Sequence, residues 1–343
     1  MSASPKILLV KLSSLGDVLH NLPIVWDLRI RLPDTQIDWV VEEAYVHLLT
    51  PLLSRDSFRG IDHIIPFGLR RWKKSLFKIS TWKEFFAFRK ILQSTAYDIL
   101  IETQGLLKSA IVCSLAKKNA DAVVTGLANA TEFSGYEPLA RFFYSQSVQV
   151  PTQCHAVDRS RWLMCSALDW SLLEHSSAPQ FYPKEFIESI ARTTVQGLRI
   201  PYVLCFHSTA RDAKRWSNSH WIAYGRELSA RGYQVVFPWG NAAEKAISES
   251  LAAQIPDAFV PPAFSIEDAF SVISGAALTV GVDTGLTHLA AALDKPTVEI
   301  YCDSPRWKTE GYWSDRICNV GDIHSPPTIE EALTASLKLL QEA

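Results

Sequence analysis

Short, continuous runs of hydrophobic residues alternate along the chain with longer segments that have the spacing of amphipathic helices. A short apolar run is typical of a strand that is buried on both faces of a parallel sheet. We predict strands at 6–12, 37–42, 61–67, 98–103, 202–208, 233–239, 277–282 and 297–302. We predict helices at 17–30, 104–118, 155–169, 218–231, 241–254 and 284–294. This alternation predicts an α/β protein whose parallel sheets are covered by helices.

The pattern is interrupted in residues 171–200, where Pro179 and Pro183 break up a weak helical spacing. Proline disfavours the interior of helices and strands, so this stretch is predicted to separate two domains. We expect Rossmann-like domains at 1–178 and 179–325. Ligands of such sheets bind at the carboxyl ends of the strands, so the polar residues that follow the strands are the candidate site residues.

Composition narrows the classes of function. The formal net charge is −2 over 343 residues, which argues against a nucleic-acid binder that relies on bulk positive charge. Six cysteines occur without a C-x-x-C pair or a cluster with histidine, which is typical of reduced thiols in a cytoplasmic protein. The first apolar run ends at Lys11, and no uninterrupted apolar stretch approaches the roughly 18 residues of a membrane-spanning helix. We therefore expect a protein with no signal peptide and no transmembrane segment.

The first predicted strand leads into KLSSLGDVLHNLP at 11–23, a Ser/Gly turn that precedes a helix. Many α/β proteins bind a phosphate at such a turn through several glycines. Here Gly16 is the one glycine, and Asp17 follows it. Asp17 is either a first-turn acid that stabilises the helix N-terminus or a carboxylate with a chemical role.

The stretch GVDTGLTHLAAALDKP at 281–296 joins a strand to a helix at Asp283, Thr284 and Gly285. The first N–H groups of such a helix and its dipole favour an anion, and a glycine lets the anion approach the backbone. His288 lies one turn further along the same side. Taken alone, a plain N-cap formed by Asp283 or Thr284 is the favoured interpretation.

Two further strand ends change that balance. FHSTARDAKRW at 206–216 carries Thr209 and Lys214, and a lysine can act as a point charge on a diphosphate. PWGNAAEK at 238–245 places Glu244 in the first turn of a helix, where it either compensates the dipole or accepts hydrogen bonds from a ribose. A solvated loop is the alternative for the first segment. Together, the three strand ends predict a site for a nucleoside diphosphate.

Residues 70–90, RRWKKSLFKISTWKEFFAFRK, combine eight Lys or Arg residues and six aromatic residues with one acidic residue. Single-stranded nucleic acid suits such a mixture, but the near-zero net charge argues against it. A segment at an anionic membrane surface fits better, with basic groups at the head groups and aromatic rings at the lipid boundary. An ordinary helix with a buried aromatic face explains part of the aromatic content but not the charge imbalance.

Six motifs occur in order, and together they resemble the lipopolysaccharide heptosyltransferases of glycosyltransferase family 9. They are KLSSLGDVLHNLP (11–23), RRWKK (70–74), TQGLLKSA (103–110), FHSTARDAKRW (206–216), PWG…E (238–244) and DTGLTHL (283–289). The resemblance runs from about residue 6 to about residue 301. It implies a GT-B fold of two Rossmann-like domains facing across a cleft, and this fold allows a helix at about 326–343 to pack back on the first domain. It also implies inverting transfer of L-glycero-D-manno-heptose from ADP-heptose to the Kdo of Kdo-lipid A, by a peripheral protein on the cytoplasmic face of the inner membrane.

The resemblance also implies roles for individual residues. Asp17 is the general base and Glu244 binds the ribose. The other donor-site residues are Thr209, Lys214, Thr284 and Gly285 at the phosphates, with Asp283 and His288 lining the site. The acceptor residues are Arg70, Arg71, Lys73 and Lys74, with Lys108 and His155 as weaker candidates. Two positions depart from the family pattern, since Ala210 replaces a second hydroxyl residue and Tyr136 replaces an arginine.

Chemistry supports the role that the resemblance gives to Asp17. Inverting transfer needs a base that takes the proton of the attacking hydroxyl on the side opposite the leaving group. If the diphosphate binds the C-terminal domain, a carboxylate of the N-terminal domain can meet that need. No Asp-x-Asp pair for a metal occurs in the sequence. We therefore expect Lys214 and the helix N-terminus at Thr284 to stabilise the leaving group, with no required metal or cofactor.

Two alternatives remain open. A transferase of the same superfamily could use another sugar or acceptor, although the RRWKK cluster at 70–74 argues for an anionic acceptor. A non-catalytic two-domain protein could close on a nucleotide or sugar. Such proteins are usually exported, and Asp17 opposite a diphosphate would have no purpose in mere binding.

Overall fold

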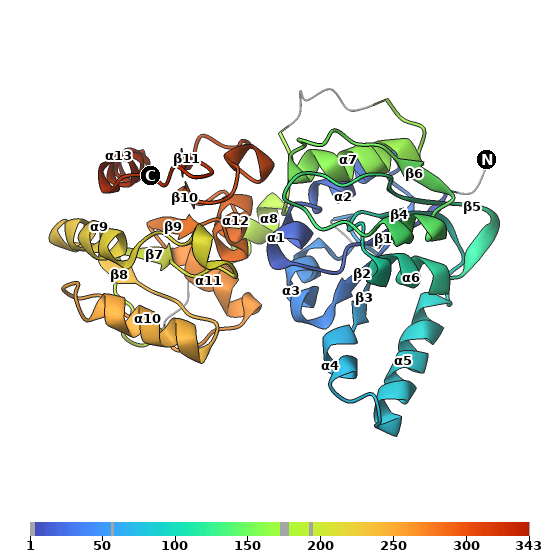
Figure 1. The fold of residues 1–343 in the computed structure, drawn as a ribbon, viewed down its shortest axis with the longest axis horizontal. Helices are drawn as coiled ribbons and strands as arrows, with labels where there is room; N and C mark the ends of the chain where they lie inside the picture. The colour runs from blue at the N-terminus through green and yellow to red at the C-terminus, as the bar shows by residue number, and fades with distance from the viewer. Residues whose placement is uncertain (1–3, 56–57, 172–177, 192–194, 343) are drawn as a thin grey trace. The chain divides into compact units, whose positions relative to one another are not determined.

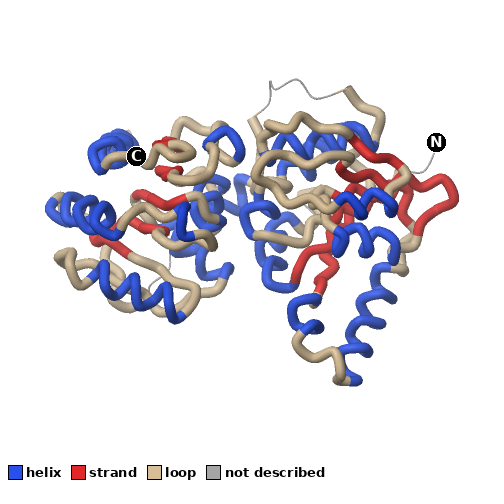
Figure 2. The backbone as a smooth tube through the Cα atoms, in the orientation of Figure 1, coloured by secondary structure: helices blue, strands red, loops and turns tan. Residues whose placement is uncertain are grey.

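The computed structural model describes residues 4–55, 58–171, 178–191 and 195–342. Contacts divide the chain into two compact units, with the boundary between Phe181 and Tyr182. Each unit is built on a parallel sheet with helices on both faces, as Figure 1 and Figure 2 show. This architecture confirms the predicted α/β fold class, and the boundary lies in the segment where the sequence interrupts its helical spacing.

The first unit has, within the described residues, a six-stranded parallel sheet with the order β3-β2-β1-β4-β5-β6. Its strands are β1 Lys6–Val10, β2 Gln36–Glu42, β3 His63–Phe67, β4 Tyr97–Glu102, β5 Lys118–Leu127 and β6 Gln146–Val148. Its helices are α1 Leu15–Leu19, α2 Pro23–Arg31, α3 Val46–Leu49, α4 Leu69–Lys73, α5 Ile79–Leu92, α6 Leu107–Leu115 and α7 Ala156–Ala167. Short 3₁₀ turns lie at Glu43–Tyr45, Thr50–Leu52 and Pro138–Phe143. The strand order reverses between β1 and β4, so the loops that follow these two strands meet at a topological switch point.

Helices cover both faces of the first sheet, which explains the continuous apolar runs in its central strands. Leu8 and Val10 of β1 belong to a buried cluster with Phe88 of α5 and Val112 of α6. The alternate residues of β1 are also fully buried. The helix α7 contacts β4, β5, β6 and α2, and Figure 1 shows α2 and α7 on the face opposite α5 and α6. The core therefore fixes β1 and β4, whose ends carry the candidate site.

The second unit has, within the described residues, a five-stranded parallel sheet with the order β11-β10-β9-β7-β8. Its strands are β7 Tyr202–Phe206, β8 Gln234–Val236, β9 Leu278–Val282, β10 Thr297–Tyr301 and β11 Ile317–Gly321. Its helices are α8 Lys184–Ser189, α9 Asn218–Ala230, α10 Ala242–Ala252, α11 Ile266–Gly275, α12 Gly285–Ala292 and α13 Ile329–Gln341. The remaining 3₁₀ turns lie at Asp212–Lys214 and Arg306–Lys308. Here the switch point lies between β7 and β9.

The C-terminal helix packs within the second unit. The helix α13 contacts β9, β10, β11 and α9, and Ala332 and Leu339 are buried in the core of the second unit. Its apolar side completes the helical layer over that sheet, beside Leu228 of α9. The second unit therefore extends beyond the expected limit at residue 325.

The predicted helix at 17–30 is two helices. The first, α1, ends at Leu19, and α2 begins at Pro23. A proline has no N–H to donate to the preceding turn, so it starts a new helix more readily than it continues one. The break leaves α1 as a short turn that presents Asp17 beside the end of β1.

Candidate active site

In the first unit, hydrogen bonds join the loops that follow β1 and β4. The N–H of Leu12 donates to Oε1 of Gln104 at 2.9 Å, and Nε2 of Gln104 donates to Oγ of Ser13 at 3.2 Å. Both loops lie at the switch point of the sheet. This is the position at which doubly wound sheets bind their ligands.

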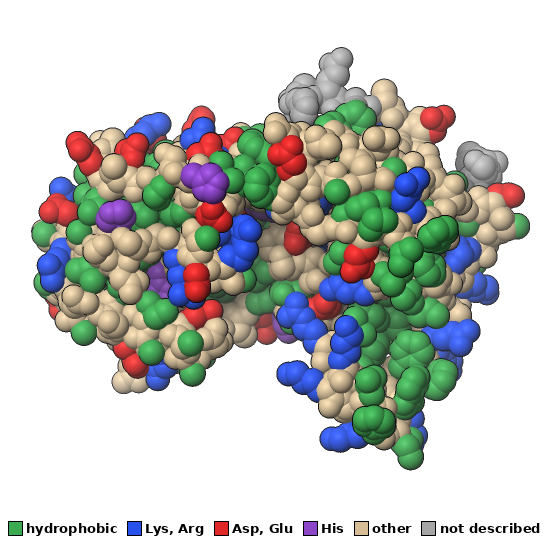
Figure 3. All heavy atoms as spheres, in the orientation of Figure 1, with side chains coloured by type: hydrophobic (Ala, Val, Ile, Leu, Met, Phe, Trp, Pro, Cys, Tyr) green, Lys and Arg blue, Asp and Glu red, His purple; other side chains and the backbone are tan. Residues whose placement is uncertain are grey.

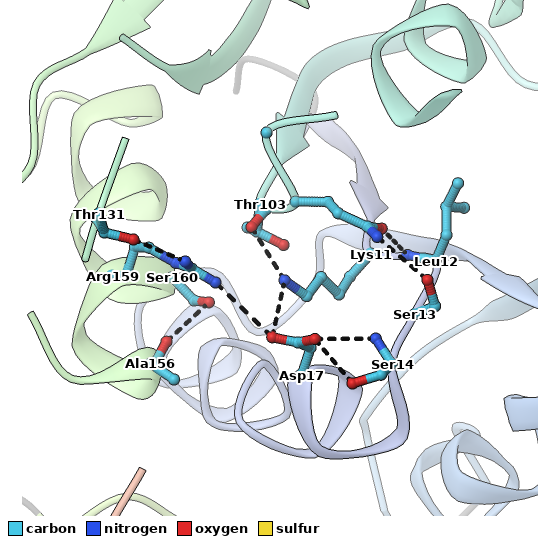
Figure 4. A network of polar contacts seen from close by, with 12 residues as sticks. Lys11, Leu12, Ser13, Ser14, Asp17, Thr103, Thr131, Ala156, Arg159 and Ser160 are labelled. Atoms are coloured by element: carbon cyan, nitrogen blue, oxygen red, sulfur yellow. Dashed lines mark hydrogen bonds and ion pairs between the residues drawn. The ribbon is translucent and has the colours of Figure 1, made fainter. Parts of the chain in front are cut away.

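Asp17 lies in the first turn of α1 at this position (Figure 4). Its Oδ2 accepts hydrogen bonds from the N–H of Ser14 at 3.0 Å and from the hydroxyl of Ser14 at 2.9 Å. Two cations approach Oδ1, with Nζ of Lys11 at 3.9 Å and Nη2 of Arg159 at 4.0 Å. Both cations are buried, whereas the side chain of Asp17 is 42% exposed. Part of the Asp17 side chain is therefore accessible to a ligand.

These neighbours keep the Asp17 carboxyl ionised at neutral pH. Burial acts to raise its pKa, but the charges of Lys11 and Arg159 and the hydrogen bonds from Ser14 outweigh burial and hold the pKa below its ordinary value. The Ser14–Asp17 hydrogen bonds also satisfy the N-terminus of α1, so the first-turn interpretation of Asp17 holds as well. A structural role and a chemical role are compatible in this geometry.

Lys11 and Arg159 are site residues that sequence reasoning missed. Nζ of Lys11 donates to the carbonyl of Thr103 at 3.2 Å, and Nη1 of Arg159 donates to the hydroxyl of Thr131 at 3.0 Å. The available signal for Lys11 was a charged residue directly after an apolar run. Nothing in the sequence distinguishes Arg159 from Arg161, the other basic residue of its helix.

A buried carboxylate, Glu42, lies between two of the predicted acceptor residues. It ends β2, and its side chain is 4% exposed. Its oxygens lie 2.6 Å from Nε of Arg70 and 3.1 Å from Nζ of Lys108. Lys108 also donates to the hydroxyl of Ser13 at 2.9 Å. Arg70 and Lys108 are thus brought together beside the Asp17 loop, and an acidic residue that closes an apolar run was the sequence signal for Glu42.

The other basic residues of the RRWKK cluster have different surroundings. Arg71 pairs with Glu43 at 2.7 Å and with Glu84. Lys73 and Lys74 are exposed, and they make no ion pair with any residue that the structure describes. Within this cluster, Lys73 and Lys74 are therefore the cations available to an external anion.

The remaining first-unit candidates have local roles. His155 is the N-cap of α7, where its Nδ1 accepts from the N–H of Val157 at 3.2 Å. Tyr136, at a position where an arginine was expected from the family pattern, donates its hydroxyl to the carbonyl of Ala128 at 2.8 Å. His155 thus caps α7, and its contact with an acceptor stays a prediction.

In the second unit, a buried chain of charged side chains follows β9. Lys214 pairs with Oδ2 of Asp283, and Oδ1 of Asp283 lies 2.9 Å from Nε2 of His288. Nδ1 of His288 lies 2.9 Å from Oε1 of Glu299, whose Oε2 accepts from the N–H of Gly311 at 2.8 Å. The structure therefore brings together three predicted residues and adds Glu299, which sequence reasoning missed. Its signal was an acidic residue in the middle of an apolar strand.

The pKa shifts in this chain follow from its geometry. Burial acts to lower the pKa of His288, but Glu299 and Asp283 outweigh it and raise that pKa to about 10. Burial acts to raise the pKa of Asp283, but His288 and Lys214 hold it well below its ordinary value. At neutral pH, His288 is therefore a buried imidazolium beside an ionised Asp283. A phosphate that contacts Lys214 would share that ammonium with Asp283.

The expected phosphate donors lie at the carboxyl ends of β7 and β9. The hydroxyl of Thr209 donates to the carbonyl of Asp283 at 3.4 Å. Thr284 is the N-cap of α12, and Gly285 is its first residue. Ala210 follows Thr209 on an exposed part of the loop. The two loops thus converge at the switch point, with the N–H groups of α12 beside Thr209.

Glu244 lies at the neighbouring strand end, after β8. Its Oε2 accepts from the N–H of Gly240 at 2.7 Å, and its Oε1 accepts from Nδ2 of Asn241 at 2.7 Å. The structure thus shows the local role of closing the N-terminus of α10. Hydrogen bonding to a ribose stays a prediction for Glu244.

Among the residues that the structure describes, no group of three or more His, Cys, Asp or Glu side chains is arranged to hold a metal ion. The six cysteines are unpaired thiols. None of the helices within the described ranges combines the length and the hydropathy needed to cross a bilayer.

Comparison with known proteins places these features in a family. Residues 85–339 match the sequence model of glycosyltransferase family 9 (heptosyltransferase). Lipopolysaccharide heptosyltransferase 1 of Pseudomonas aeruginosa is 34% identical over 331 residues, which cover 96% of this chain and 87% of that protein. The structure of Escherichia coli heptosyltransferase WaaC with ADP has a TM-score of 0.79 at 30% identity, covering 98% of this chain and 100% of that one. The same enzyme with ADP-2-deoxy-2-fluoro heptose has a TM-score of 0.74 at 31% identity, covering 98% and 99%.

Two Rossmann-like units with parallel sheets are the architecture of the GT-B glycosyltransferases, and the likeness to WaaC confirms that class. The chain belongs to glycosyltransferase family 9, the heptosyltransferases, and it is a glycosyltransferase. The predicted resemblance is thereby confirmed.

Proposed function

We propose that the chain transfers L-glycero-D-manno-heptose from ADP-heptose to the Kdo of Kdo-lipid A, with inversion, in the synthesis of the lipopolysaccharide inner core. The names of its relatives support the sugar and the pathway, and a structure of WaaC holds a fluorinated analogue of ADP-heptose. We further propose that the first unit binds the acceptor and that the second binds the donor, on a peripheral protein at the cytoplasmic face of the inner membrane.

The observation that carries this proposal is the environment of Asp17. Ser14 occupies Oδ2, while Oδ1 faces two buried cations that lie beyond hydrogen-bonding distance. Oδ1 can therefore accept the hydrogen of an attacking hydroxyl. An acceptor carboxylate that binds Lys11 or Arg159 would offset their charge and raise the basicity of Asp17. An anionic sugar acid such as Kdo would thus activate its own base.

The second unit offers what a leaving diphosphate requires. Lys214 and the N-terminus of α12 lie at the switch point, and the imidazolium of His288 offsets the charge of Asp283, the carboxylate that pairs with Lys214. Preorganised positive charge stabilises the charge that develops on the leaving group. Thr209 and Glu244 would contact a phosphate and the ribose.

The test compares Asp17→Ala with Asp268→Ala. Asp268 makes the same capping contacts in α11, where it accepts from the N–H of Ser265 at 2.9 Å and from its hydroxyl at 2.8 Å. The two variants lose similar local structure, but only Asp17→Ala loses the proposed base. We expect Asp17→Ala to lower kcat by on the order of 10²–10⁴ and to leave ADP binding nearly unchanged. Turnover at the wild-type rate in Asp17→Ala would contradict the assignment of Asp17 as the general base.

A further inference from the structure

A large apolar groove of the first unit lies beside the proposed catalytic cluster. It has a volume of about 710 Å³ and lies between α6 and the α4–α5 hairpin, by which we mean residues 69–92. Its apolar lining includes Trp72, Leu76, Trp82, Phe85, Leu107 and Ile111. A volume of this size is within the range of about 300–1,000 Å³ that is typical of small-molecule pockets.

The groove is open, and large apolar side chains around it face solvent. Leu76 is 50% exposed, Trp82 is 51% exposed and Ile111 is 41% exposed. Phe77, at the turn of the hairpin, is fully exposed. Figure 3 shows hydrophobic side chains gathered over this part of the first unit, with Lys and Arg side chains beside them. Exposed apolar clusters of this kind mark a surface that binds a partner or a membrane.

The charge around the groove identifies the partner. Lys73 lines the groove together with one acidic residue, Glu137, whose carboxylate accepts a hydrogen bond from the N–H of Leu107. Lys74, Lys78 and Lys83 lie on the same hairpin. None of these four exposed lysines has an ion-pair partner among the described residues. The one acid of the hairpin, Glu84, is engaged by Arg71. The hairpin therefore presents apolar side chains and uncompensated positive charge together, as interfacial membrane anchors do.

We propose that this groove binds one fatty-acyl chain of an anionic membrane phospholipid, with the lipid head group among the exposed lysines of the hairpin. The proposal rests on the membrane contact in the proposed function and gives it a specific site. A second copy of the chain is a poor occupant, because a two-fold contact would place the same lysines opposite one another. An anionic phospholipid supplies both the apolar chain and the negative charge in one molecule.

The groove lies next to the loop that carries Asp17, so a bound lipid would affect where that loop is held. Lys108 also lines the groove, and it donates to Ser13 at 2.9 Å in the loop that carries Asp17. A lipid in the groove would therefore hold the Asp17 loop at the bilayer surface, where a lipid-linked acceptor presents its sugars.

The test uses Leu76→Gln/Ile111→Gln, which makes two exposed groove residues polar. The matched control is Ile30→Gln/Ile200→Gln, which changes two apolar residues that are 79% and 70% exposed outside the groove. Calorimetry with monomeric lysophosphatidylglycerol measures the binding of a lipid that has one fatty-acyl chain. The same measurement with glycerophosphoglycerol tests the binding of the head group alone. We expect the wild type and the control variant to bind the lysolipid with similar affinity. The groove variant should bind the lysolipid at least about tenfold more weakly. All three proteins should bind glycerophosphoglycerol much more weakly than the wild type binds the lysolipid.

Fluorescence quenching by a brominated lipid locates the bound fatty-acyl chain. Vesicles of dibrominated phosphatidylglycerol should quench the tryptophan fluorescence of the wild type, and Trp82→Phe should lose part of that quenching while it still binds the vesicles. Equal lysolipid binding by the groove variant and the control would overturn the proposal. Comparable binding of glycerophosphoglycerol, or a concentration-dependent dimer that the groove variant abolishes, would also overturn it.

Turnover of a deacylated acceptor in solution separates this proposal from the proposed function. The groove variant should retain that turnover, because the chain-binding groove is not needed for an acceptor without chains. If the wild type transfers heptose neither to the deacylated acceptor nor to the acylated one, the proposed function is wrong, whereas the lysolipid measurement still decides on the groove.

Discussion

The residues proposed for catalysis and binding in both units lie at or near the ends of strands, and how readily the sequence reveals each of them depends on where it lies. Asp17 and Lys214 lie in the segments that follow apolar runs, where a polar residue is a natural candidate for function. Glu42 and Glu299 lie inside or at the end of such runs, and their partners are distant in the sequence. Arg159 approaches Asp17 across 142 positions, and only the packing of α7 brings it there. Residue types at strand ends were thus predictable, and pairings across the sheet were not.

At Lys214, we predict that substitution by alanine weakens ADP binding and slows turnover. A charged hydrogen bond to a partly buried phosphate contributes roughly 1.5–3 kcal/mol, which corresponds to roughly 10- to 150-fold in Kd. Calorimetric titration with ADP and a parallel measurement of kcat test the prediction. Lys245→Ala, on a neighbouring exposed helix, is the control and should change neither. Unaltered ADP affinity and kcat in Lys214→Ala would place the phosphate site elsewhere.

The charge on His288 leads to a prediction about Glu299. The pKa of His288 is raised to about 10 in the folded protein, above its ordinary value of about 6.5. Its stabilising contribution is therefore complete below about pH 6.5 and is lost as the pH rises through about 10. In Glu299→Gln, one of the two carboxylates is gone, so the pKa of His288 should fall towards neutrality. Carbon-13 NMR of labelled histidine, assigned with His288→Gln, should show imidazolium at pH 8.5 in the wild type and neutral imidazole in Glu299→Gln.

At the scale of elements, the apolar runs predicted most of the central strands, but several strands are shorter than predicted. The runs at 6–12 and 202–208 extend two residues past β1 and β7, because Lys11, Leu12 and His207 are themselves buried although they lie outside the strands. The strands β6 and β11 are edge strands with little buried apolar surface, so periodicity did not reveal them. The first residues of β5 are exposed, which hid that strand as well. The hydrophobic pattern of the sequence therefore reveals strands that are buried, and it misses strands whose pairing buries little apolar surface.

The contact of β9 with α12 gives an element-scale prediction. A Cβ added at Gly281 of β9 would lie 2.1 Å from Oγ1 of Thr287 and 2.9 Å from Cβ of Phe206. We predict that Gly281→Ala lowers the free energy of unfolding by about 1–3 kcal/mol, because helix and strand must move apart. Gly135→Ala is the control, since its added Cβ meets only an ordinary contact with Leu106 at 3.6 Å. Urea titrations of both variants measure the difference, and equal midpoints would contradict the close packing.

At the scale of the whole molecule, the sequence predicted two parallel-sheet units and the segment that separates them. It did not predict that α13 packs on the sheet of the second unit. An amphipathic helix can cover any apolar surface of the right width, and only tertiary contacts select one. It also treated RRWKK as one cluster. The structure divides that cluster into Arg70 and Arg71, which pair with acidic residues, and Lys73 and Lys74, which remain available among the described residues.

This division determines how the whole molecule should respond to salt and to charge removal. The net charge is only −2, so attraction to an anionic acceptor must come from local positive charge and not from the total. We predict that Lys73→Gln/Lys74→Gln raises the acceptor KM, leaves the donor KM unchanged and preserves the melting temperature. Two basic residues near an anionic surface contribute about 2 kcal/mol together, or roughly 30-fold. Added salt should raise the wild-type acceptor KM and affect the variant less, because screening acts over about 10 Å at 0.1 M ionic strength.

Arg70→Gln/Arg71→Gln should also lower the melting temperature, since it leaves the buried Glu42 without one of its partners. Lys184→Gln/Lys245→Gln in the second unit removes the same charge and should change neither KM, so an equal effect of the two lysine pairs would show that bulk charge, and not this cluster, attracts the acceptor.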